Sequence, residues 1–237
     1  SHERALVRYY VAAGCSGLAV AVLSTQFEIR EPQHALFEPV LELATRTIDD
    51  EMAKSARPFL KIAGVCGHPA QALKEAETAR TLGYHAALVS VAAWKSESEE
   101  EILAHCRTVS QVLPIIGFYL QASIGGRIFT SRFWRAFAEI ENAVAIKIAP
   151  FNRFQTLDVV RAVAESGRDD LALYTGNDDN IIIDLLTPFR FQVNGRTVER
   201  RIVGGLLGHW GVWTRAAVAL FEQIKAERRK PSISVDW

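Results

Sequence analysis

The chain has 237 residues, of which 49% are hydrophobic and 23% charged, and its 27 basic residues balance 27 acidic ones. This length suits one large domain, and the composition is ordinary for a soluble globular protein. A net charge of zero argues against general electrostatic binding to nucleic acid or to an anionic membrane, so we expect neither partner.

Cysteine content and hydropathy bear on the compartment. The chain has 3 cysteines, Cys15, Cys66 and Cys106, which lie far apart and form no CxxC or Cys/His spacing typical of zinc. The longest uncharged apolar stretch, residues 11–25, is too short to cross a bilayer. We therefore expect a cytoplasmic protein with reduced cysteines and no metal site.

Short apolar runs alternate with amphipathic segments along the whole chain. The helical patterns cover residues 3–13, 36–55, 70–82, 98–112, 130–139, 154–166 and 213–229. The strand patterns cover residues 17–25, 58–66, 84–92, 113–120, 144–149, 171–176 and 201–208. Capping residues support several helix ends: Ser98 with Glu101 forms a capping-box pattern, and Gly83 and Gly167 stand where helices commonly end.

The spacing of the strands indicates the fold. Strands start about every 30 residues, which is the rhythm of βα units in a parallel sheet. No glycine-rich dinucleotide fingerprint follows the first strand, which favours a closed barrel over an open doubly wound sheet. We therefore predict an α/β fold, a single (β/α)8 TIM barrel over residues 1–237. Because residues 3–13 are predicted to be a helix, the first strand of that barrel is expected to be absent from the chain.

One lysine stands alone within the apolar strand of residues 144–149. Strand alternation places bulky side chains on one face and small ones beside the lysine on the other: Val144, Ile146 and Ile148 against Ala145, Lys147 and Ala149. An ammonium costs several kcal/mol to strip of water, and desolvation lowers the pKa of lysine and yields a nucleophilic amine. Such an amine is what Schiff-base chemistry requires. Lys61 also lies in an apolar strand, but near its N-terminal end, where we expect a structural role.

With Lys147 on the sixth strand of a barrel, the chain resembles the dihydrodipicolinate synthase / N-acetylneuraminate lyase family of class I aldolases. Tyr119 precedes Lys147 by 28 residues, the spacing found in that family. The resemblance covers residues 3–228. It rests further on Ala13-Gly14-Cys15-Ser16-Gly17-Leu18 before Ser24-Thr25, on Ala63-Gly64-Val65-Cys66-Gly67, and on the turn Tyr174-Thr175-Gly176-Asn177-Asp178-Asp179.

The resemblance implies a mechanism without a cofactor or metal. Lys147 would form an imine with the ketone of pyruvate or another 2-keto acid, and Tyr119 would shuttle the proton. Ser24 and Thr25 would bind the keto-acid carboxylate or relay a proton to Tyr119. The resemblance also implies a homotetramer or homodimer, and a C-terminal helical extension that the chain lacks. We expect both ends to be truncated relative to the family.

The substrate-binding set is expected to comprise Gly176, Asn177, Trp94 and Gly205. Trp94 stands where the family has an aromatic hydroxyl, and Ile124 where synthases have an arginine. These departures favour a less acidic or more aromatic aldehyde as the second substrate. The alternatives are dihydrodipicolinate synthase itself, a non-catalytic barrel of the same family, and a phosphosugar barrel suggested by the glycines in residues 204–208.

Overall fold

A parallel sheet forms the centre of the molecule, which is represented by a computed structural model describing residues 2–22, 27–55 and 57–230. Within this part, seven strands pair in the order β1-β2-β3-β4-β5-β6-β9, and every pairing is parallel. They are β1 (Gly17–Val20), β2 (Leu60–Val65), β3 (Ala86–Val89), β4 (Ile115–Leu120), β5 (Ala143–Ala149), β6 (Ala172–Thr175) and β9 (Gly204–Gly205). Six of the seven fall within the predicted strand segments, and β5 begins one residue before its predicted segment, at Ala143.

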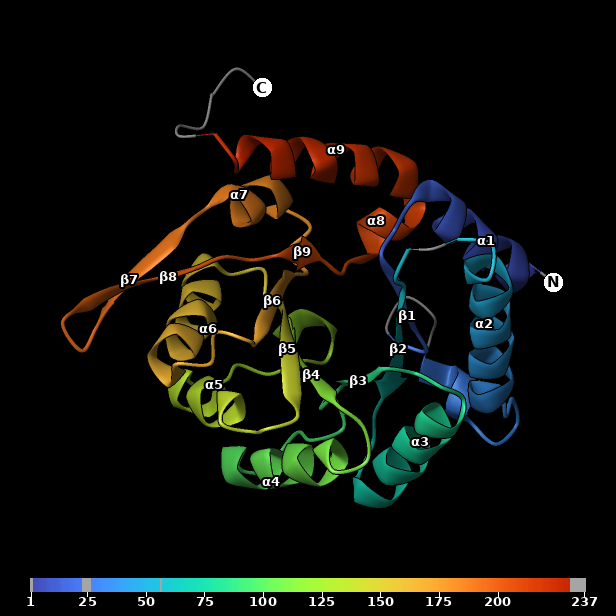
Figure 1. Cartoon of the computed structure of the whole chain (residues 1–237). Helices are drawn as coiled ribbons and strands as arrows, with labels where there is room; N and C mark the ends of the chain where they lie inside the picture. Colours follow the sequence, from blue (N-terminus) through green and yellow to red (C-terminus); the bar gives the residue numbers. More distant parts are fainter. Residues whose placement is uncertain (1, 23–26, 56, 231–237) are drawn as a thin grey trace.

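Helices surround the sheet, and the sheet curls inside them (Figure 1). They are α1 (His2–Ala13), α2 (Phe37–Met52), α3 (Pro69–Thr81), α4 (Glu99–Ser110), α5 (Ser131–Ala138), α6 (Arg153–Ser166), α7 (Ile181–Leu186), α8 (Gly208–Val212) and α9 (Thr214–Glu227), with short 3-10 turns η2 (Phe27–Arg30) and η3 (Ala122–Ile124). The α/β prediction is therefore confirmed as a curled parallel sheet with an outer layer of helices. In the described residues β1 and β9 are the two edge strands of the sheet, and they do not pair with each other. A complete eight-stranded barrel is therefore not observed.

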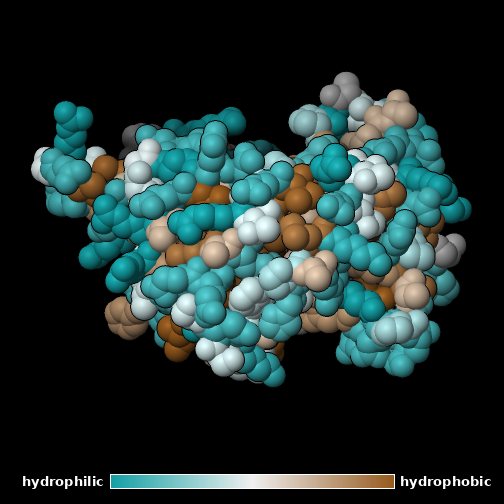
Figure 2. Space-filling model, turned by 90° about the horizontal axis from the view of Figure 1, so that it is seen from below, coloured by the Kyte–Doolittle hydropathy of each residue, from teal (hydrophilic) through white to brown (hydrophobic). Residues whose placement is uncertain are grey.

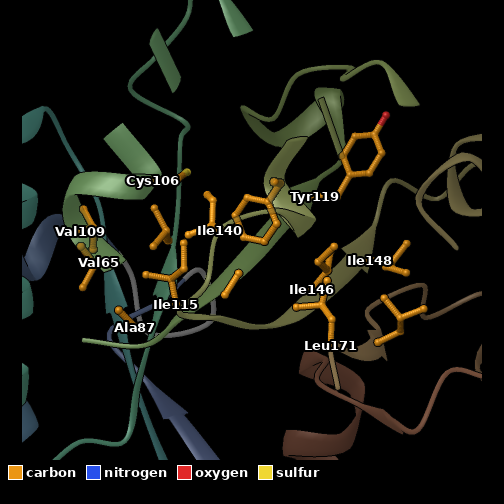
Figure 3. Packing of buried hydrophobic residues seen from close by; sticks show 14 of the residues in the cluster. Val65, Ala87, Cys106, Val109, Ile115, Tyr119, Ile140, Ile146, Ile148 and Leu171 are labelled. Carbon is orange, nitrogen blue, oxygen red and sulfur yellow. The ribbon is translucent and has the colours of Figure 1, made fainter. Parts of the chain in front are cut away.

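The sheet separates two apolar layers, as alternation along each strand requires. The layer between sheet and helices contains Ile115, Ile146 and Ile148 (Figure 3). The layer on the concave side contains Ile116, Phe118, Leu120, Ala145 and Ala149. A register shift at the start of β4 and β5 breaks the alternation once: Val144, expected to face the helices, is 41% exposed.

The segment between β6 and β9 holds an element that the sequence reading missed. Strands β7 (Phe189–Val193) and β8 (Arg196–Arg200) form an antiparallel hairpin that projects from the body beside α6 (Figure 1). Its two-residue turn is Asn194-Gly195, with φ of 49° and 75°. Asn-Gly is the preferred pair for such turns because both positions need positive φ. That dipeptide was the available signal for the hairpin.

The outer face seen in Figure 2 is mostly hydrophilic, with apolar residues in scattered groups. Among the described residues, no helix combines the length and apolar character needed to span a membrane. The predicted capping box is present: Ser98 accepts from the Glu101 backbone N–H, and Glu101 accepts from that of Ser98. Gly167 ends α6 with φ of 73°, as predicted for a helix C-terminus.

Candidate active site

Lys147 lies in the middle of a row of side chains that crosses three strands on the concave side of the sheet. It pairs in register with Phe118 on β4 and with Tyr174 on β6. The Lys147 Nζ lies 4.3 Å from the centroid of the Phe118 ring. Both Phe118 and Tyr174 belong to the apolar layer on this side. The amine therefore lies against the ring of Phe118, and Tyr174 is its register partner on the other neighbouring strand.

Small residues line the next level towards the C-terminal ends of the strands. A Cβ on Gly176 would lie 3.0 Å from the Lys147 Cε and 2.7 Å from the Ala149 Cβ. A side chain at position 176 would thus overlap Ala149 and crowd the lysine. The absence of a side chain at Gly176 leaves room for the lysine, and it places this predicted substrate-binding residue next to Lys147.

Burial shifts the protonation of the lysine. Desolvation lowers the pKa of Lys147 from its ordinary value of 10.5 to about 8, and the carboxylate of Asp178 partly opposes this by attracting the charged form. With a pKa of about 8, roughly a tenth of the amine is neutral at pH 7, against fewer than about one molecule in a thousand at the ordinary value. Partial exposure of the side chain leaves it open to solvent.

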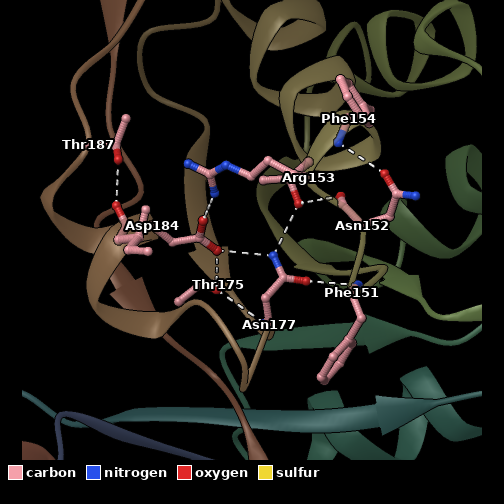
Figure 4. Close-up of polar contacts among 10 residues, drawn as sticks. Phe151, Asn152, Arg153, Phe154, Thr175, Asn177, Asp184 and Thr187 are labelled. Carbon is pink, nitrogen blue, oxygen red and sulfur yellow. Dashed lines mark hydrogen bonds and ion pairs between the residues drawn. The ribbon is translucent and has the colours of Figure 1, made fainter.

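A buried polar network fixes the loops that follow β5 and β6 (Figure 4). Asp184, with 0% of its surface exposed, accepts hydrogen bonds from Thr175 Oγ1 at 2.7 Å and Asn177 Nδ2 at 3.0 Å, and forms an ion pair with Arg153. Asn177 in turn accepts from the Phe151 backbone N–H at 3.0 Å. The network ties the loop carrying Asp178 to the loop at the end of the Lys147 strand.

Asn177 is held in place by this network, and its contact with substrate stays a prediction. Its side chain is 3% exposed, and its amide is fully engaged by Asp184, Thr156 and Phe151. The residue that precedes α7 is Asn180, and its side chain makes no capping hydrogen bond.

The structure does not bring Tyr119 to Lys147, contrary to the sequence prediction. Phe118, not Tyr119, is opposite Lys147, so Tyr119 faces the helices, where it packs against Phe129 and Trp134. Its hydroxyl accepts a hydrogen bond from the Phe129 backbone N–H at 3.3 Å. It lines a cavity of about 250 Å³ between the segments that follow β4 and β5, and Lys147 is not among the lining residues. Strand alternation is the reason: neighbouring residues face opposite sides.

Trp94 is also directed away from the lysine. Its indole Nε1 donates to the Gly67 carbonyl at 3.0 Å, and its ring lies 5.3 Å from His68 and 4.6 Å from His105. It belongs to the layer between sheet and helices, not to the concave layer beside Lys147, and its contact with substrate stays a prediction. The predicted hydroxyl pair, Ser24 and Thr25, lies outside the described residues.

The glycines near β9 make room for aromatic rings. A Cβ on Gly204 would lie 3.0 Å from Tyr174 Cε1, and one on Gly205 would lie 2.8 Å from the Trp210 ring. Packing therefore accounts for both glycines, which weakens the interpretation of residues 204–208 as a phosphate cradle. Gly205 lies on the strand next to that of Tyr174, and the absence of its side chain leaves room for the Trp210 ring.

Lys61 has the structural role expected of it. Its Nζ donates to Thr45 Oγ1 at 2.9 Å and to Asp49 Oδ1 at 2.9 Å, both on α2. The side chain thus points to the helix layer, away from the concave face. Of the two strand lysines, Lys147 alone has its amine without a hydrogen bond or ion pair to another described residue.

Two residues near Lys147 were not singled out from the sequence. Tyr174 and Asp178 belong to the turn motif of residues 174–179, and Tyr174 also lies within the predicted strand of residues 171–176. Asp178 accepts a hydrogen bond from the His209 backbone N–H at 3.3 Å. The register of two neighbouring strands, which a sequence does not give, is what assigns Tyr174 to the lysine row.

No protein-family model matches the chain, and no curated protein sequence gives a significant match. Solved structures do match. A dihydrodipicolinate synthase from Agrobacterium tumefaciens aligns with a TM-score of 0.74 at 18% identity, covering 94% of this chain and 69% of that one. The enzyme from Acinetobacter baumannii, solved in complex with pyruvate, aligns with a TM-score of 0.73 at 18% identity over 94% and 69%.

A third structure, a dihydrodipicolinic acid synthase family protein from E. coli in complex with pyruvate, aligns with a TM-score of 0.73 at 15% identity, covering 94% of this chain and 68% of that one. At such identities the similarity concerns the fold. The resemblance expected from the sequence is thus confirmed at that level: the chain has the fold of the dihydrodipicolinate synthase family.

Proposed function

We propose that the protein is a Schiff-base-forming lyase or aldolase that acts on pyruvate or another 2-keto acid through Lys147. The observation that carries the proposal is a lysine on the concave face of a curled parallel sheet, with a pKa lowered to about 8. The fold supports it, because solved proteins of the same fold bind pyruvate. The neutral amine would attack the keto carbon to form an imine, which withdraws electrons from the adjacent carbon.

The second substrate is proposed to be an aldehyde of low charge. Phe118 and Leu120 face the lysine side of β4 with apolar surface. Arg127, the nearest arginine to the place where synthases carry one, is occupied elsewhere: it donates to the Glu97 carbonyl at 2.7 Å and lies 5.5 Å from the Phe129 ring. Burying a second carboxylate without a cation is costly. We therefore favour an apolar or aromatic aldehyde over the dicarboxylate chemistry of dihydrodipicolinate synthase.

Borohydride trapping tests the proposal. Reduction in the presence of pyruvate should add the mass of the reduced adduct to the peptide containing Lys147, and Lys147→Ala should abolish it. Lys61→Ala is the matched control, since Lys61 is the other buried strand lysine and is paired with Asp49. A panel of 2-keto acids in place of pyruvate defines the donor. Adducts on Lys61, or none with any 2-keto acid, would contradict the proposal.

A non-catalytic barrel is the second candidate, favoured by the orientation of Tyr119. In that case Lys147 would form an adduct with a keto acid, but no aldehyde would be consumed or released. The predicted homodimer or homotetramer can be tested in the same preparation by light scattering after gel filtration.

A further inference from the structure

We infer that Tyr174 is the phenol that moves protons at Lys147, the role that was predicted for Tyr119. The inference rests on the proposed function, since it names a second catalytic residue for the same site. It follows from the lysine row on the concave face, in which Tyr174 is the register partner of Lys147 on the neighbouring strand.

The positions of the other phenols single out Tyr174. The chain has 5 tyrosines, all of them described. Tyr9 and Tyr10 lie next to each other on α1, with ring centroids 5.7 Å apart. The Tyr84 hydroxyl donates to a backbone carbonyl of α2 at 2.9 Å. Tyr119 faces the helices. Tyr174 is thus the phenol that packs in the concave layer with the lysine.

The surroundings of Tyr174 leave its hydroxyl available. The residue is partly exposed, and no hydrogen bond joins its hydroxyl to another described residue. Gly204 provides space for its ring, because a Cβ there would lie 3.0 Å from Tyr174 Cε1. Burial raises the pKa of Tyr174, so the phenol is protonated at neutral pH and begins as an acid.

The proton steps balance with one phenol. The Lys147 nitrogen adds its lone pair to the keto carbon, the carbonyl π pair moves to oxygen, and this oxygen takes the proton of Tyr174. The phenolate removes a proton from the cationic nitrogen and becomes a phenol again. It then protonates the leaving hydroxyl, water departs, and the nitrogen lone pair forms the imine. The phenolate finally takes a proton from the carbon next to the imine, giving the enamine and restoring the phenol.

The last of these steps can be measured directly. In D₂O, repeated formation of the enamine replaces the methyl protons of pyruvate by deuterium, which ¹H NMR follows as a loss of the methyl signal. Tyr174→Phe removes the hydroxyl and keeps the ring, so we expect exchange to slow by about 100-fold, a typical contribution of general acid–base catalysis. Slow trapping of Lys147 by borohydride should persist in this variant. The exchange rate of wild type as a function of pH should also depend on an ionisation that Tyr174→Phe lacks.

Tyr119→Phe is the matched control, and it should exchange pyruvate within about threefold of wild type because its hydroxyl faces the other side of the sheet. Gly204→Ala offers a second route to the same residue. It displaces the ring without removing the hydroxyl. The exchange rate should therefore fall when Gly204→Ala is made in the wild-type chain, and it should not fall further when Gly204→Ala is combined with Tyr174→Phe.

The outcomes separate the two proposals. If Tyr174→Phe exchanges pyruvate and is trapped at the same rates as wild type, the role of Tyr174 is overturned and the chemistry at Lys147 stands. A large loss of exchange in Tyr119→Phe in place of Tyr174→Phe would have the same meaning. Absence of trapping in wild type with every 2-keto acid would overturn the proposed function, and the inference with it.

Discussion

At the scale of single residues, the buried lysine is a cost to stability that a function would explain. Its folded pKa of about 8 lies below the ordinary 10.5, so the folded state binds fewer protons than the unfolded state between these values. Stability must therefore rise as pH increases from about 8 to 10.5, and below pH 8 the full cost of desolvating the ammonium remains.

Lys147→Met should accordingly stabilise the fold. At pH 7 we expect an increase in the free energy of unfolding of about 1–2 kcal/mol, because the partly exposed ammonium no longer has to be desolvated. The gain should shrink above pH 8 and vanish near 10.5. Urea unfolding at several pH values measures it. A variant that is less stable than wild type at pH 7 would show that the ammonium is well accommodated.

The position of each lysine along its strand separated the structural role of Lys61, which its ion pair with Asp49 shows, from the role that is proposed for Lys147. The spacing did not predict which face of the sheet Tyr119 occupies. A spacing of 28 residues specifies which strand a tyrosine occupies but not which face it presents, because a one-residue change in register turns every side chain to the other face. The shift between β4 and β5 is such a change.

At the scale of elements, the network around Asp184 holds the loops after β5 and β6. Asp184→Asn should remove the charge that pairs with Arg153 and introduce a donor next to Asn177. We expect a loss of about 2–4 kcal/mol in the free energy of unfolding, the usual consequence of breaking a buried pair. Chemical denaturation measures it. Asp179→Asn, on the exposed part of the same loop, is the control, and equal losses in both would refute a special role of the network.

The contact between β4 and α5 depends on a glycine. A Cβ on Gly117 would lie 2.8 Å from Phe137 Cζ and 3.2 Å from Trp134 Cζ3, so the strand and helix can approach only where the side chain is absent. Gly117→Ala should destabilise the protein by about 1–3 kcal/mol through overpacking. Thermal unfolding monitored by tryptophan fluorescence would report it, with Gly208→Ala as a control variant whose Cβ meets no neighbouring atom and whose φ is not positive. An unchanged midpoint in Gly117→Ala would contradict this packing.

Most of the elements could be predicted from hydrophobic periodicity, because strands buried on both faces and amphipathic helices have distinct patterns. The hairpin β7–β8 could have been found from Asn194-Gly195. The polar network could not, since Thr175, Asp184 and Arg153 come from three segments whose approach depends on the tertiary fold.

At the scale of the molecule, every second side chain of each strand faces the concave side of the curled sheet, so side chains from separate strands lie together there. This brings Phe118, Lys147 and Tyr174, which are far apart in the sequence, into one row. The α/β class and parallel order followed from the rhythm of the sequence. Closure of the barrel did not, because it depends on pairing between the first and last strands, which periodicity within each strand does not encode.

The central claim is that Lys147 is an amine ready to attack a 2-keto acid near neutral pH. The most direct test is the initial rate of borohydride-trapped pyruvate adduct on the Lys147 peptide as a function of pH, followed by mass spectrometry. The account predicts a rate that rises with pH to a midpoint near 8, set by the pKa of the lysine. A midpoint near 10.5, as for an ordinary lysine, or no adduct on Lys147 at any pH, would contradict it.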